Sequence, residues 1–570
     1  MVTVMVTGMA TDMAMTTPNR LPGQYFLALV IVAASFPASA QQAALGGQQI
    51  PGSAISSNSA ATSGASSAAP DLAAEGSGTQ SSRAFVIKPK IKFTETWTDN
   101  VSIVRTGNGK ESGFITELAP GVNINAKTAR LKAKLDYTLL GQFYSTPSGY
   151  SRTQNSLNSF GTLEAVEQWL FVDFSGVIAQ QAKSAFGPQS PSSSSLNKNL
   201  TETATYRLSP YIRGQFAGLV EYSLRYNRST TQASAATVSD IELSEWTGQI
   251  RGSTPFQSLR WSLDASQQSA DYSLGRKTDA ERLYATATYL VVPQFSVSVS
   301  GGTESNNYAS ANSESHTTHG YGFDWTPTER TKVSAFKDRR FFGDGHRFNF
   351  THRFSRSSIS YSDTKDVAVL PNQFASVGLG ATNLDLAYQT CTLAQSQQYP
   401  DLDQLDQVCT AWANWYVSQQ GLPPNGQATA SFLFSRATLQ RRQQLAIAVQ
   451  GARNTLTVMF NRNEMQSLFA SSTLPDDFSS TTGIRQRGLS INYSHRLSGL
   501  TSLNLLASRQ ESVSTGVSAL EVKTTIYQAN LTSSLGPRTT GGLSIRHTTS
   551  DSNLNPYTEN ALIGTLSVNF

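Results

Sequence analysis

The strongest constraint in this chain is an alternation of apolar and polar side chains, which recurs in segments of about ten residues. In the clearest example, Leu131, Ala133, Leu135, Tyr137, Leu139, Gly141 and Phe143 alternate with Lys132, Lys134, Asp136 and Gln142. Similar segments are residues 170–178, 259–264, 439–450, 455–461 and 489–493. Because successive side chains of a β-strand point to opposite faces, each segment predicts a strand with one apolar and one polar face.

The connections between these segments alternate in length. Short ones contain Gly, Pro or Asn, which favour tight turns, as in Gly451-Ala-Arg-Asn454 and Gly536-Pro-Arg538. The long ones are residues 145–154, 183–198, 227–240, 304–316, 366–428 and 466–483. Short turns at one end and long loops at the other are typical of outer-membrane barrels, whose long loops are extracellular.

We therefore predict an all-β fold over residues 84–570. It is a transmembrane, antiparallel, up-and-down β-barrel of about 22 strands, within limits of roughly 18 to 24. A soluble β-sandwich array or a propeller is the alternative, and neither explains the asymmetry in connection length.

Residues 557–570 support this prediction. Leu562, Gly564, Leu566, Val568 and Phe570 fall on one face of an extended strand, and the other face is mostly polar. In a closed barrel this strand would pair with the one near residues 85–97, and its final aromatic residue would lie at the membrane interface. We expect Leu566, Val568 and Phe570 to close the barrel and to act as a signal for the outer-membrane assembly machinery. An edge strand of a soluble sheet is the alternative.

The first 83 residues are expected to lie outside the barrel. Asn19-Arg20 precedes an apolar run at residues 25–36, which is followed by Pro37-Ala38-Ser39-Ala40. This pattern predicts a secretory signal peptide over residues 1–40, with Ala38 and Ala40 preceding the cleavage site. A retained membrane anchor is the alternative, although the run is too short to span a bilayer. Residues 41–83 are rich in Ser, Ala, Gly and Gln, which predicts a disordered, low-complexity periplasmic segment.

Composition limits the possible functions. Charged residues make up 15% of the chain, below the roughly 25% usual in soluble domains, and the net charge is +5. No basic block indicates a nucleic-acid partner, and no motif indicates a cofactor, a metal or a catalytic nucleophile. The closest approach to a metal pair is His316 with His319, in a segment that is predicted to be a loop entering a strand.

Charged residues that interrupt the apolar alternation are expected to face a water-filled lumen. A charge on the lipid face costs about 2–4 kcal/mol at mid-membrane, whereas a wet interior tolerates it. These residues are Lys132, Lys134, Asp136, Asp173, Asp264 and Arg442. Their role is either lumen solvation and cross-strand pairing or selection of the solutes that pass. A basic stretch at residues 337–342, with Arg347, is placed near the outer rim, facing lipopolysaccharide phosphates or an anionic polysaccharide.

The long loop at residues 366–428 is expected to be extracellular. It contains Cys391 and Cys409, which predict a local disulfide in an exported protein, two unpaired thiols being the alternative. It also contains Trp412, Trp415 and Tyr416, which favour burial. Barrels this wide usually hold a plug, and residues 41–83 are too short to supply one. We therefore expect this loop to fold inward or to cap the outer mouth.

Several segments resemble the PEP-CTERM system-associated outer-membrane proteins, a family found beside exosortase and exopolysaccharide genes. The resemblance lies in Phe93-Thr-Glu-Thr-Trp-Thr-Asp-Asn-Val101, Glu117-Leu-Ala-Pro-Gly-Val122, Val166-Glu-Gln-Trp-Leu-Phe-Val-Asp-Phe174, Ser209-Pro-Tyr211 and Arg453-Asn-Thr-Leu-Thr457. It covers most of the chain after about residue 84 and consists of strand and turn patterns rather than a reactive site, so it implies no catalytic residues. It implies the outer membrane of a Gram-negative bacterium, with lipid and lipopolysaccharide around the protein, and an association with exopolysaccharide or its export components.

Three functions remain open from the sequence. The first is a conduit or accessory component for the passage of polysaccharide or solutes, and a continuous stripe of inward charge would favour it. The second is a structural or surface-binding barrel, an adhesin or assembly partner, and a lumen crossed by paired charges and loops would favour it. The third is a rim enzyme, for which Asp99 with Asp338, or His346 with Asp344, are weak candidates.

Overall fold

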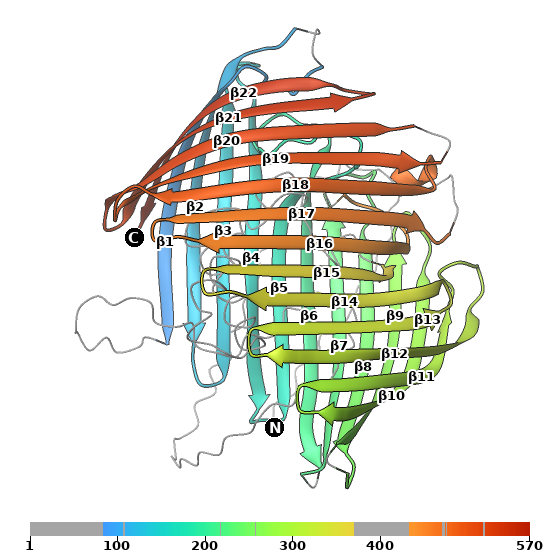
Figure 1. The fold of residues 1–570 in the computed structure, drawn as a ribbon. Coiled ribbons are helices and arrows are strands. Elements are labelled where there is room, and N and C mark those ends of the chain that lie inside the picture. Colours follow the sequence, from blue (N-terminus) through green and yellow to red (C-terminus); the bar gives the residue numbers. More distant parts are fainter. Residues whose placement is uncertain are drawn as a thin grey trace, which may run out of the picture. The chain divides into compact units, whose positions relative to one another are not determined.

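The chain forms a closed antiparallel barrel in a computed structural model (Figure 1). The structure describes residues 84–105, 109–216, 218–256, 258–369, 432–469, 474, 476–516 and 519–570, all within one compact unit of the chain. Each of the 22 strands pairs with its neighbours in sequence, and β1 pairs with β22. The predicted fold class is therefore confirmed. Among the described residues, no helix is long and apolar enough to cross a membrane.

The strands follow one another in chain order round the barrel. The first eleven are β1 (Phe85–Thr98), β2 (Gly113–Lys127), β3 (Leu131–Tyr144), β4 (Ser151–Val166), β5 (Leu170–Ala182), β6 (Leu200–Phe216), β7 (Val220–Ala233), β8 (Ile241–Ser253), β9 (Leu259–Tyr272), β10 (Thr278–Val292) and β11 (Phe295–Asn306). The others are β12 (Glu314–Thr328), β13 (Thr331–Arg340), β14 (Gly343–Arg353), β15 (Ser357–Ala368), β16 (Thr438–Gln450), β17 (Asn454–Ser467), β18 (Gly483–Arg496), β19 (Thr501–Thr515), β20 (Glu521–Gly536), β21 (Thr539–Ser552) and β22 (Tyr557–Asn569). A short 3-10 helix, η1 (Asp477–Ser479), lies between β17 and β18.

The two rims of the barrel differ in their connections, as predicted. At the rim near Phe85 and Phe570, which we call the turn rim, the strands are joined by two to five residues. At the opposite rim, the loop rim, most connections are longer, and the longest joins β15 to β16 through residues 369–437. In outer-membrane barrels the short turns are periplasmic and the long loops extracellular, so the loop rim is the outer mouth.

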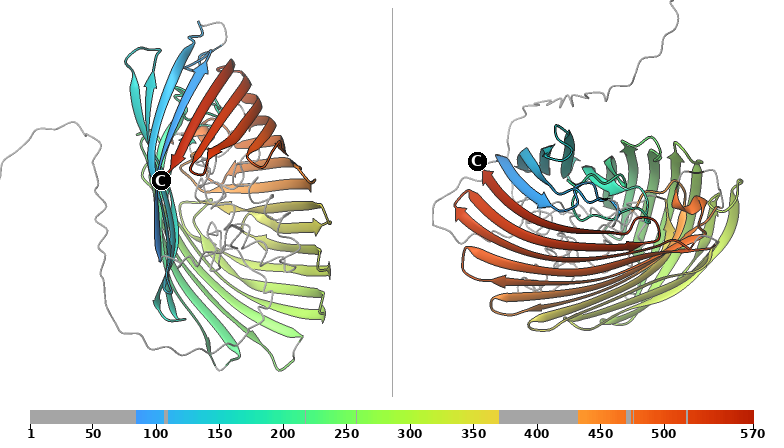
Figure 2. Two further views of the ribbon diagram at one scale, coloured as in Figure 1. Left: turned by 90° about the vertical axis from the view of Figure 1, so that its left-hand side faces the viewer. Right: turned by 90° about the horizontal axis from the view of Figure 1, so that it is seen from above.

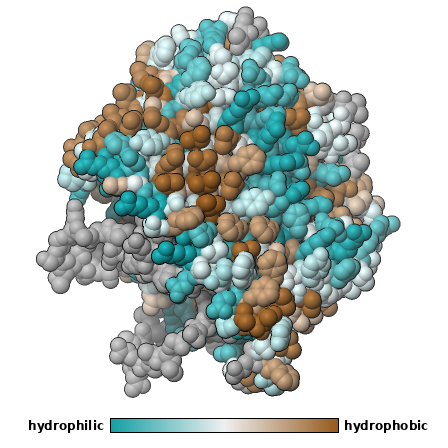
Figure 3. All heavy atoms as spheres, in the orientation of Figure 1, coloured by the Kyte–Doolittle hydropathy of each residue, from teal (hydrophilic) through white to brown (hydrophobic). Residues whose placement is uncertain are grey.

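The outer wall of the barrel carries an apolar belt toward the turn rim. Outward-facing residues of β16–β18 illustrate it: Leu445, Ile447, Val449, Leu456, Val458, Phe460, Leu489, Ile491 and Tyr493. Many are large side chains that remain exposed, such as Val449 at 43% and Leu489 at 44%. Figure 3 shows apolar side chains over the turn-rim part of these strands and hydrophilic ones toward their loop-rim ends.

Several strands extend further toward the loop rim than the alternation predicts. Strand β7 continues to Ala233, β4 begins at Ser151, and β11 and β12 shorten the expected loop at residues 304–316 to residues 307–313. Beyond the membrane both faces of a strand meet water, so the alternation that marks a strand disappears there. The strands therefore continue beyond the apolar belt toward the loop rim. Figure 2 shows the ribbon of the barrel from two further directions.

The barrel is closed by the pairing of β1 with β22. Its register runs from Lys90 opposite Asn569 to Thr98 opposite Ala561. On the outer face, Leu566 lies opposite Phe93 and Val568 opposite Ile91. The backbone N–H of Phe570 donates to the carbonyl of Pro89 at 2.9 Å, which continues the pairing to the turn rim.

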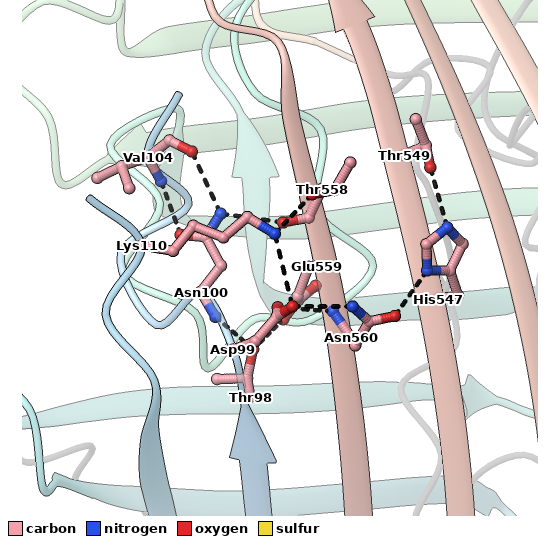
Figure 4. Close-up of polar contacts among 10 residues, drawn as sticks. All are labelled: Thr98, Asp99, Asn100, Val104, Lys110, His547, Thr549, Thr558, Glu559 and Asn560. Carbon is pink, nitrogen blue, oxygen red and sulfur yellow. Dashed lines mark hydrogen bonds and ion pairs between the residues drawn. The ribbon is translucent and has the colours of Figure 1, made fainter. Parts of the chain in front are cut away.

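Polar side chains hold the seam at its loop-rim end (Figure 4). Asp99 accepts hydrogen bonds from the backbone N and from Nδ2 of Asn560, both at 2.8 Å. The buried Asn100 side chain donates to the carbonyl of Thr558 at 3.1 Å, and Thr98 Oγ1 donates to Glu559 at 3.1 Å. Three consecutive residues after the last apolar pair of β1 thus bind three consecutive residues of β22, which gives the Thr98-Asp99-Asn100 motif a structural role.

Deleting Phe570 tests the contribution of this seam to assembly. The deletion removes a backbone hydrogen bond to Pro89 and an aromatic side chain at the turn rim. We expect a reduced yield of heat-modifiable, membrane-inserted barrel, measured by gel mobility of outer-membrane fractions. The matched control is Phe216→Ala, which removes an aromatic residue that is 73% exposed at the same rim but takes no part in closure. Equal yields for the two variants would contradict the prediction.

Candidate functional site: the lumen and its outer mouth

The inner wall of β1–β3 is strongly basic toward the turn rim. Its inward-facing basic residues there are Lys88, Lys90, Lys92, Lys127, Lys132 and Lys134, and we call these six the lysine cluster. Lys90 contacts Asp136 at 2.5 Å, and Asn123 donates to the same carboxylate at 3.2 Å. Glu117, the next inward charged residue of β2 toward the loop rim, accepts a hydrogen bond from Gln142 at 2.9 Å. Two carboxylates thus face six lysines, so this part of the lumen attracts anions.

The other charges predicted to face the lumen lie on separate strands. Asp173 on β5 contacts Arg225 at 2.8 Å and accepts a hydrogen bond from Thr162 at 2.8 Å. Asp264 on β9 accepts from Gln249 at 2.5 Å and from Ser262 at 3.0 Å. Arg442 on β16 lies opposite Thr364 and Asn463, with Gln440 at 3.5 Å. The structure brings Lys132, Lys134 and Asp136 together on β3 and leaves Asp173, Asp264 and Arg442 distributed round the wall.

Arginine and aromatic side chains continue the basic wall on β5–β7. The rings of Phe171 and Tyr211 stack with centroids 5.2 Å apart. Arg213 lies 4.4 Å from the centroid of Phe171, and Arg225 lies 4.0 Å from that of Tyr211. Such cation–π contacts hold the guanidinium groups against the wall and keep them oriented.

The remaining lumen wall divides into two parts. On β10–β15 the charges are paired across strands: Arg282 contacts Asp338 at 3.2 Å, and Arg340 contacts Glu304 at 2.6 Å and also Asp366. On β16–β20 the inward side chains are mostly uncharged amides and hydroxyls, including Gln444, Asn461, Asn463, Gln486, Ser490, Ser508, Gln510 and Gln528. The lumen therefore has a basic side and a neutral polar side.

The outer mouth is bridged by the segment at residues 432–437, which precedes β16 and which we call the crossing segment. Phe432 pairs in parallel with Ala182 at the end of β5, and the N–H of Leu433 donates to the Ala182 carbonyl at 3.1 Å. Strands β5 and β16 are eleven apart in a ring of 22, so they lie on opposite sides of the barrel. Gly275, in the β9–β10 loop, also lies close to the backbone of Ser435. The space is so small that a Cβ atom at position 275 would lie 2.6 Å from the Ser435 carbonyl oxygen.

The β5–β6 loop, residues 183–199, meets the crossing segment in an apolar cluster. Its members include Ala185, Phe186, Phe432, Phe434, Met465, Phe478 and Ile484, all of them buried. The same loop is also tied to the rim at β1–β3, since Tyr144 Oη donates to the Ser194 carbonyl at 2.6 Å and the N–H of Leu196 donates to the Val101 carbonyl at 3.0 Å. Tyr557 Oη also donates to the Gln189 carbonyl. The loop thus lies across the mouth instead of projecting from the rim.

A buried ion pair fixes the crossing segment to the β17–β18 loop. Arg436 contacts Asp476 at 2.6 Å, with side-chain exposures of 4% and 2%. Asp476 also accepts a hydrogen bond from the backbone N–H of Ser435 at 3.1 Å. Removing one member of a buried pair leaves the other charge without compensation, which costs about 3–5 kcal/mol.

The neighbouring Asp477 joins the β5–β6 loop to the same place. Its carboxyl group accepts hydrogen bonds from Ser184 Oγ and from the backbone N–H of Ala185, both at 2.7 Å. Burial raises the pKa of the Asp477 carboxyl from 3.8 to about 6, an effect that the adjacent charge of Asp476 reinforces and these two hydrogen bonds oppose. A cavity of about 510 Å³ lies beside this contact, lined by residues that include Lys183, Lys198, Asp476 and Asp477.

The histidines do not form a site in the part of the chain that the structure describes. His316 and His319 both lie in β12, where a spacing of three places them on opposite faces of the strand. His346 contacts Asp363 at 2.9 Å rather than Asp344, and Asp338 contacts Arg282. Among these described residues, no group of three or more His, Cys, Asp or Glu side chains is placed to hold a metal ion. Cys391, Cys409, Ala38, Ala40 and nearly all of the loop at residues 366–428 lie outside them.

Comparisons with known proteins concern the barrel. No protein-family model matches the chain, and no curated protein matches it. Among solved structures, it is similar to the FrpB iron transporter from Neisseria meningitidis (F5-1 variant), at 8% identity and a TM-score of 0.46 over 85% of this chain and 82% of that chain. It is also similar to the siderophore receptor PirA from Pseudomonas aeruginosa, at 8% identity and a TM-score of 0.41 over 85% of this chain and 80% of that chain. A third similar structure is the outer membrane protein opdK from Pseudomonas aeruginosa, at 6% identity and a TM-score of 0.33 over 85% of this chain and 99% of that chain.

The location follows from the barrel itself. A closed sheet leaves no strand edge unpaired, and its apolar belt faces outward, which are the two requirements for crossing a bilayer with strands. The protein is thus located in the outer membrane of a Gram-negative bacterium, as predicted.

Sequence reasoning missed the residues that bridge the mouth. Two features of the sequence could have indicated burial. Phe432-Leu-Phe434 is an apolar run that follows a long polar loop, and Phe478 is an isolated aromatic residue after two aspartates. Their partners Ala182, Ala185 and Phe186 are far away in sequence, and no periodicity indicates contacts across a barrel.

Replacing Arg436 by Ala tests whether the ion pair keeps the mouth bridged. The substitution leaves Asp476 buried and uncompensated, at a cost of about 3–5 kcal/mol, so the crossing segment should detach. We expect a larger mean single-channel conductance in planar bilayers. The control is Arg462→Ala, which removes an exposed pair with Glu464 worth roughly 0–1 kcal/mol. An unchanged conductance for the Arg436 variant would count against a bridging role.

The raised pKa of Asp477 predicts that the mouth responds to pH. Burial of Asp477 beneath the docked β5–β6 loop raises the pKa of this carboxyl above 3.8, so the docked state favours the protonated side chain. The stabilisation that Asp477 gives to the docked loop is therefore fully present below pH 3.8 and is lost as the pH rises to about 6. We expect conductance to increase between about pH 4 and pH 6 and then to level off. In Asp477→Asn this increase should disappear, because the side chain no longer titrates. The same pH profile in both proteins would refute the assignment.

Proposed function

We propose that the protein is an outer-membrane conduit for polar solutes that carry negative charge, with a mouth that is bridged at rest. The observation that carries the proposal is the lysine cluster, in which six inward lysines face two carboxylates, Asp136 and Glu117. Clefts lined by charge of one sign raise the local concentration of oppositely charged solutes. The arginine groups near Phe171 and Tyr211 extend this attraction along the wall.

An acidic polysaccharide is the solute class that we propose for this conduit. The neutral amides and hydroxyls of β16–β20 are suited to hydrogen bonds with the hydroxyl groups of a polysaccharide. The lysine cluster is suited to ion pairs with the carboxylates of an acidic polysaccharide. The resemblance to outer-membrane proteins found beside exopolysaccharide genes supports the same class. Deleting the gene should lower the amount of secreted acidic polysaccharide, and unchanged secretion would overturn this part of the proposal.

Ion selectivity tests the role of the lysine cluster directly. In the double variant Lys88→Gln with Lys132→Gln, the pairing of Lys90 with Asp136 is kept while two cationic side chains are neutralised. We expect the anion-to-cation permeability ratio, measured from reversal potentials, to fall about twofold or more. The control is Lys523→Gln, which neutralises a lysine on the outer wall. Equal ratios in the double variant and the control would contradict the proposal.

A second candidate function is a structural or surface-binding barrel without transport. The mouth contacts across the barrel and the paired charges of β10–β15 favour it. The two candidates differ in what happens when the bridge is released. A conduit should pass ions once Arg436 is replaced, whereas a structural barrel should show no added conductance.

A further inference from the structure

The outer wall of β13–β20 carries charged side chains directly above the apolar belt. On β16, the outward residues Gln443 and Arg441 follow Leu445 toward the loop rim. On β17, Arg462 follows Phe460, and on β18, Arg487 and Arg485 follow Leu489. The cross-strand register aligns these positions, since Gln443 lies opposite Arg462 and Arg462 opposite Arg487. The charges thus form a continuous band across neighbouring strands.

This band has an excess of basic residues, and we call them the basic girdle. Its members are Lys337, Arg339, Lys365, Arg441, Arg462, Arg485, Arg487, Arg509 and Lys523. The outward acidic residues on the same strands are fewer: Asp344, Asp363, Glu464, Glu511 and Glu521. The stretch at residues 337–342 is divided between the two faces of β13, because Lys337 and Arg339 face outward whereas Asp338 and Arg340 bind partners in the lumen.

Most members of the basic girdle have an acidic neighbour, but they retain N–H donors that can bind a further anion. Glu464 is shared by Arg462 at 2.5 Å and Arg485 at 3.0 Å, and Asp344 is shared by Lys337 at 3.0 Å and Arg339 at 3.2 Å. The guanidinium-bearing side chains stay about half exposed, for example Arg487 at 59% and Arg485 at 51%. Each shared carboxylate therefore leaves donor groups that point away from the wall.

The opposite wall of the barrel has the reverse charge. On β7–β10 the outward charged residues are Glu242, Asp271, Asp279 and Glu281, against Arg228 alone. Arg228 is itself paired with Glu242 at 2.5 Å. A general need for solubility above the membrane would not separate the charges in this way, so the girdle points to a ligand on one side of the barrel.

We propose that the basic girdle binds the phosphate groups of lipid A, the lipid anchor of lipopolysaccharide in the outer leaflet. These phosphates lie at the boundary between acyl chains and sugars, and the girdle lies at the boundary between the apolar belt and the charged wall. Arginine presents paired N–H donors that match phosphate oxygens. Acyl chains of the same lipid would lie against Leu445, Phe460 and Leu489 below.

Binding of lipid A to the purified full-length protein tests the proposal. The girdle variant combines Arg441→Gln, Arg462→Gln, Arg485→Gln and Arg487→Gln, and the matched control combines Glu242→Gln, Asp271→Asn, Asp279→Asn and Glu281→Gln. Native mass spectrometry in detergent would count lipid A bound to wild type and both variants, with EDTA present to remove divalent cations. We expect at least a tenfold loss of affinity in the girdle variant and no loss in the control. Equal binding by all three proteins would overturn the proposal.

Two further measurements on the wild-type protein keep the test independent of how the variants fold. Lipid A from which both phosphates have been removed should bind at least tenfold more weakly than intact lipid A, and equal binding would refute the assignment to phosphate. Inorganic phosphate and an acidic oligosaccharide serve as competitors. If either displaces lipid A at an equal concentration, the girdle is a general anion site and the proposal fails.

Discussion

Backbone pairing along the β1–β22 seam is the constraint on which the rest of the barrel depends. In hydrocarbon an unpaired N–H or C=O group costs several kcal/mol, so a sheet can remain in a membrane only when its first and last strands bind each other. The seam register, from Lys90 opposite Asn569 to Thr98 opposite Ala561, fixes which side chains of β1 and β22 face lipid. Every other strand takes its inward and outward faces from this one closure, because each follows its neighbour in register. The contacts of Asp99 and Asn100 with β22 fix the register at the height where lipid gives way to water.

Closure divides the wall into zones with different chemistry. Below the outer interface the outward residues are apolar, and above it they are charged, with basic residues on β13–β20 and acidic ones on β7–β10. The inner face is mostly polar through the membrane, and its largest apolar cluster lies at the mouth, where Phe186, Phe432 and Phe478 are buried. An apolar cluster in the mouth of a wet barrel is stable only while these loops remain docked, since their separation would expose the rings to water.

The sequence was sufficient for the fold because the alternation within each membrane-spanning strand is local and repeats 22 times. It was insufficient beyond the membrane. Residues such as Asn227 and Thr231 look like a loop in the sequence, although they belong to β7, because polar side chains occupy both faces of the strand there. The placements of Lys134 and Asp136 follow from alternation within one strand. The pairing of Arg436 with Asp476 and the contact of Phe432 with Ala182 do not, because they join segments on opposite sides of a ring.

The bridge across the mouth is separable from the structure that keeps the barrel in the membrane. The crossing segment, the β5–β6 loop and η1 lie outside the strand ladder, so their release breaks no hydrogen bond between neighbouring strands. Arg436 and Asp476 stabilise the bridge by a buried charge pair, whereas Asp477 favours it most when protonated. We therefore expect the contribution of Asp477 to the bridge to fall as the pH rises to about 6. A mouth built in this way can open without any rearrangement of the wall, and the lysine cluster below it then faces the exterior through the lumen.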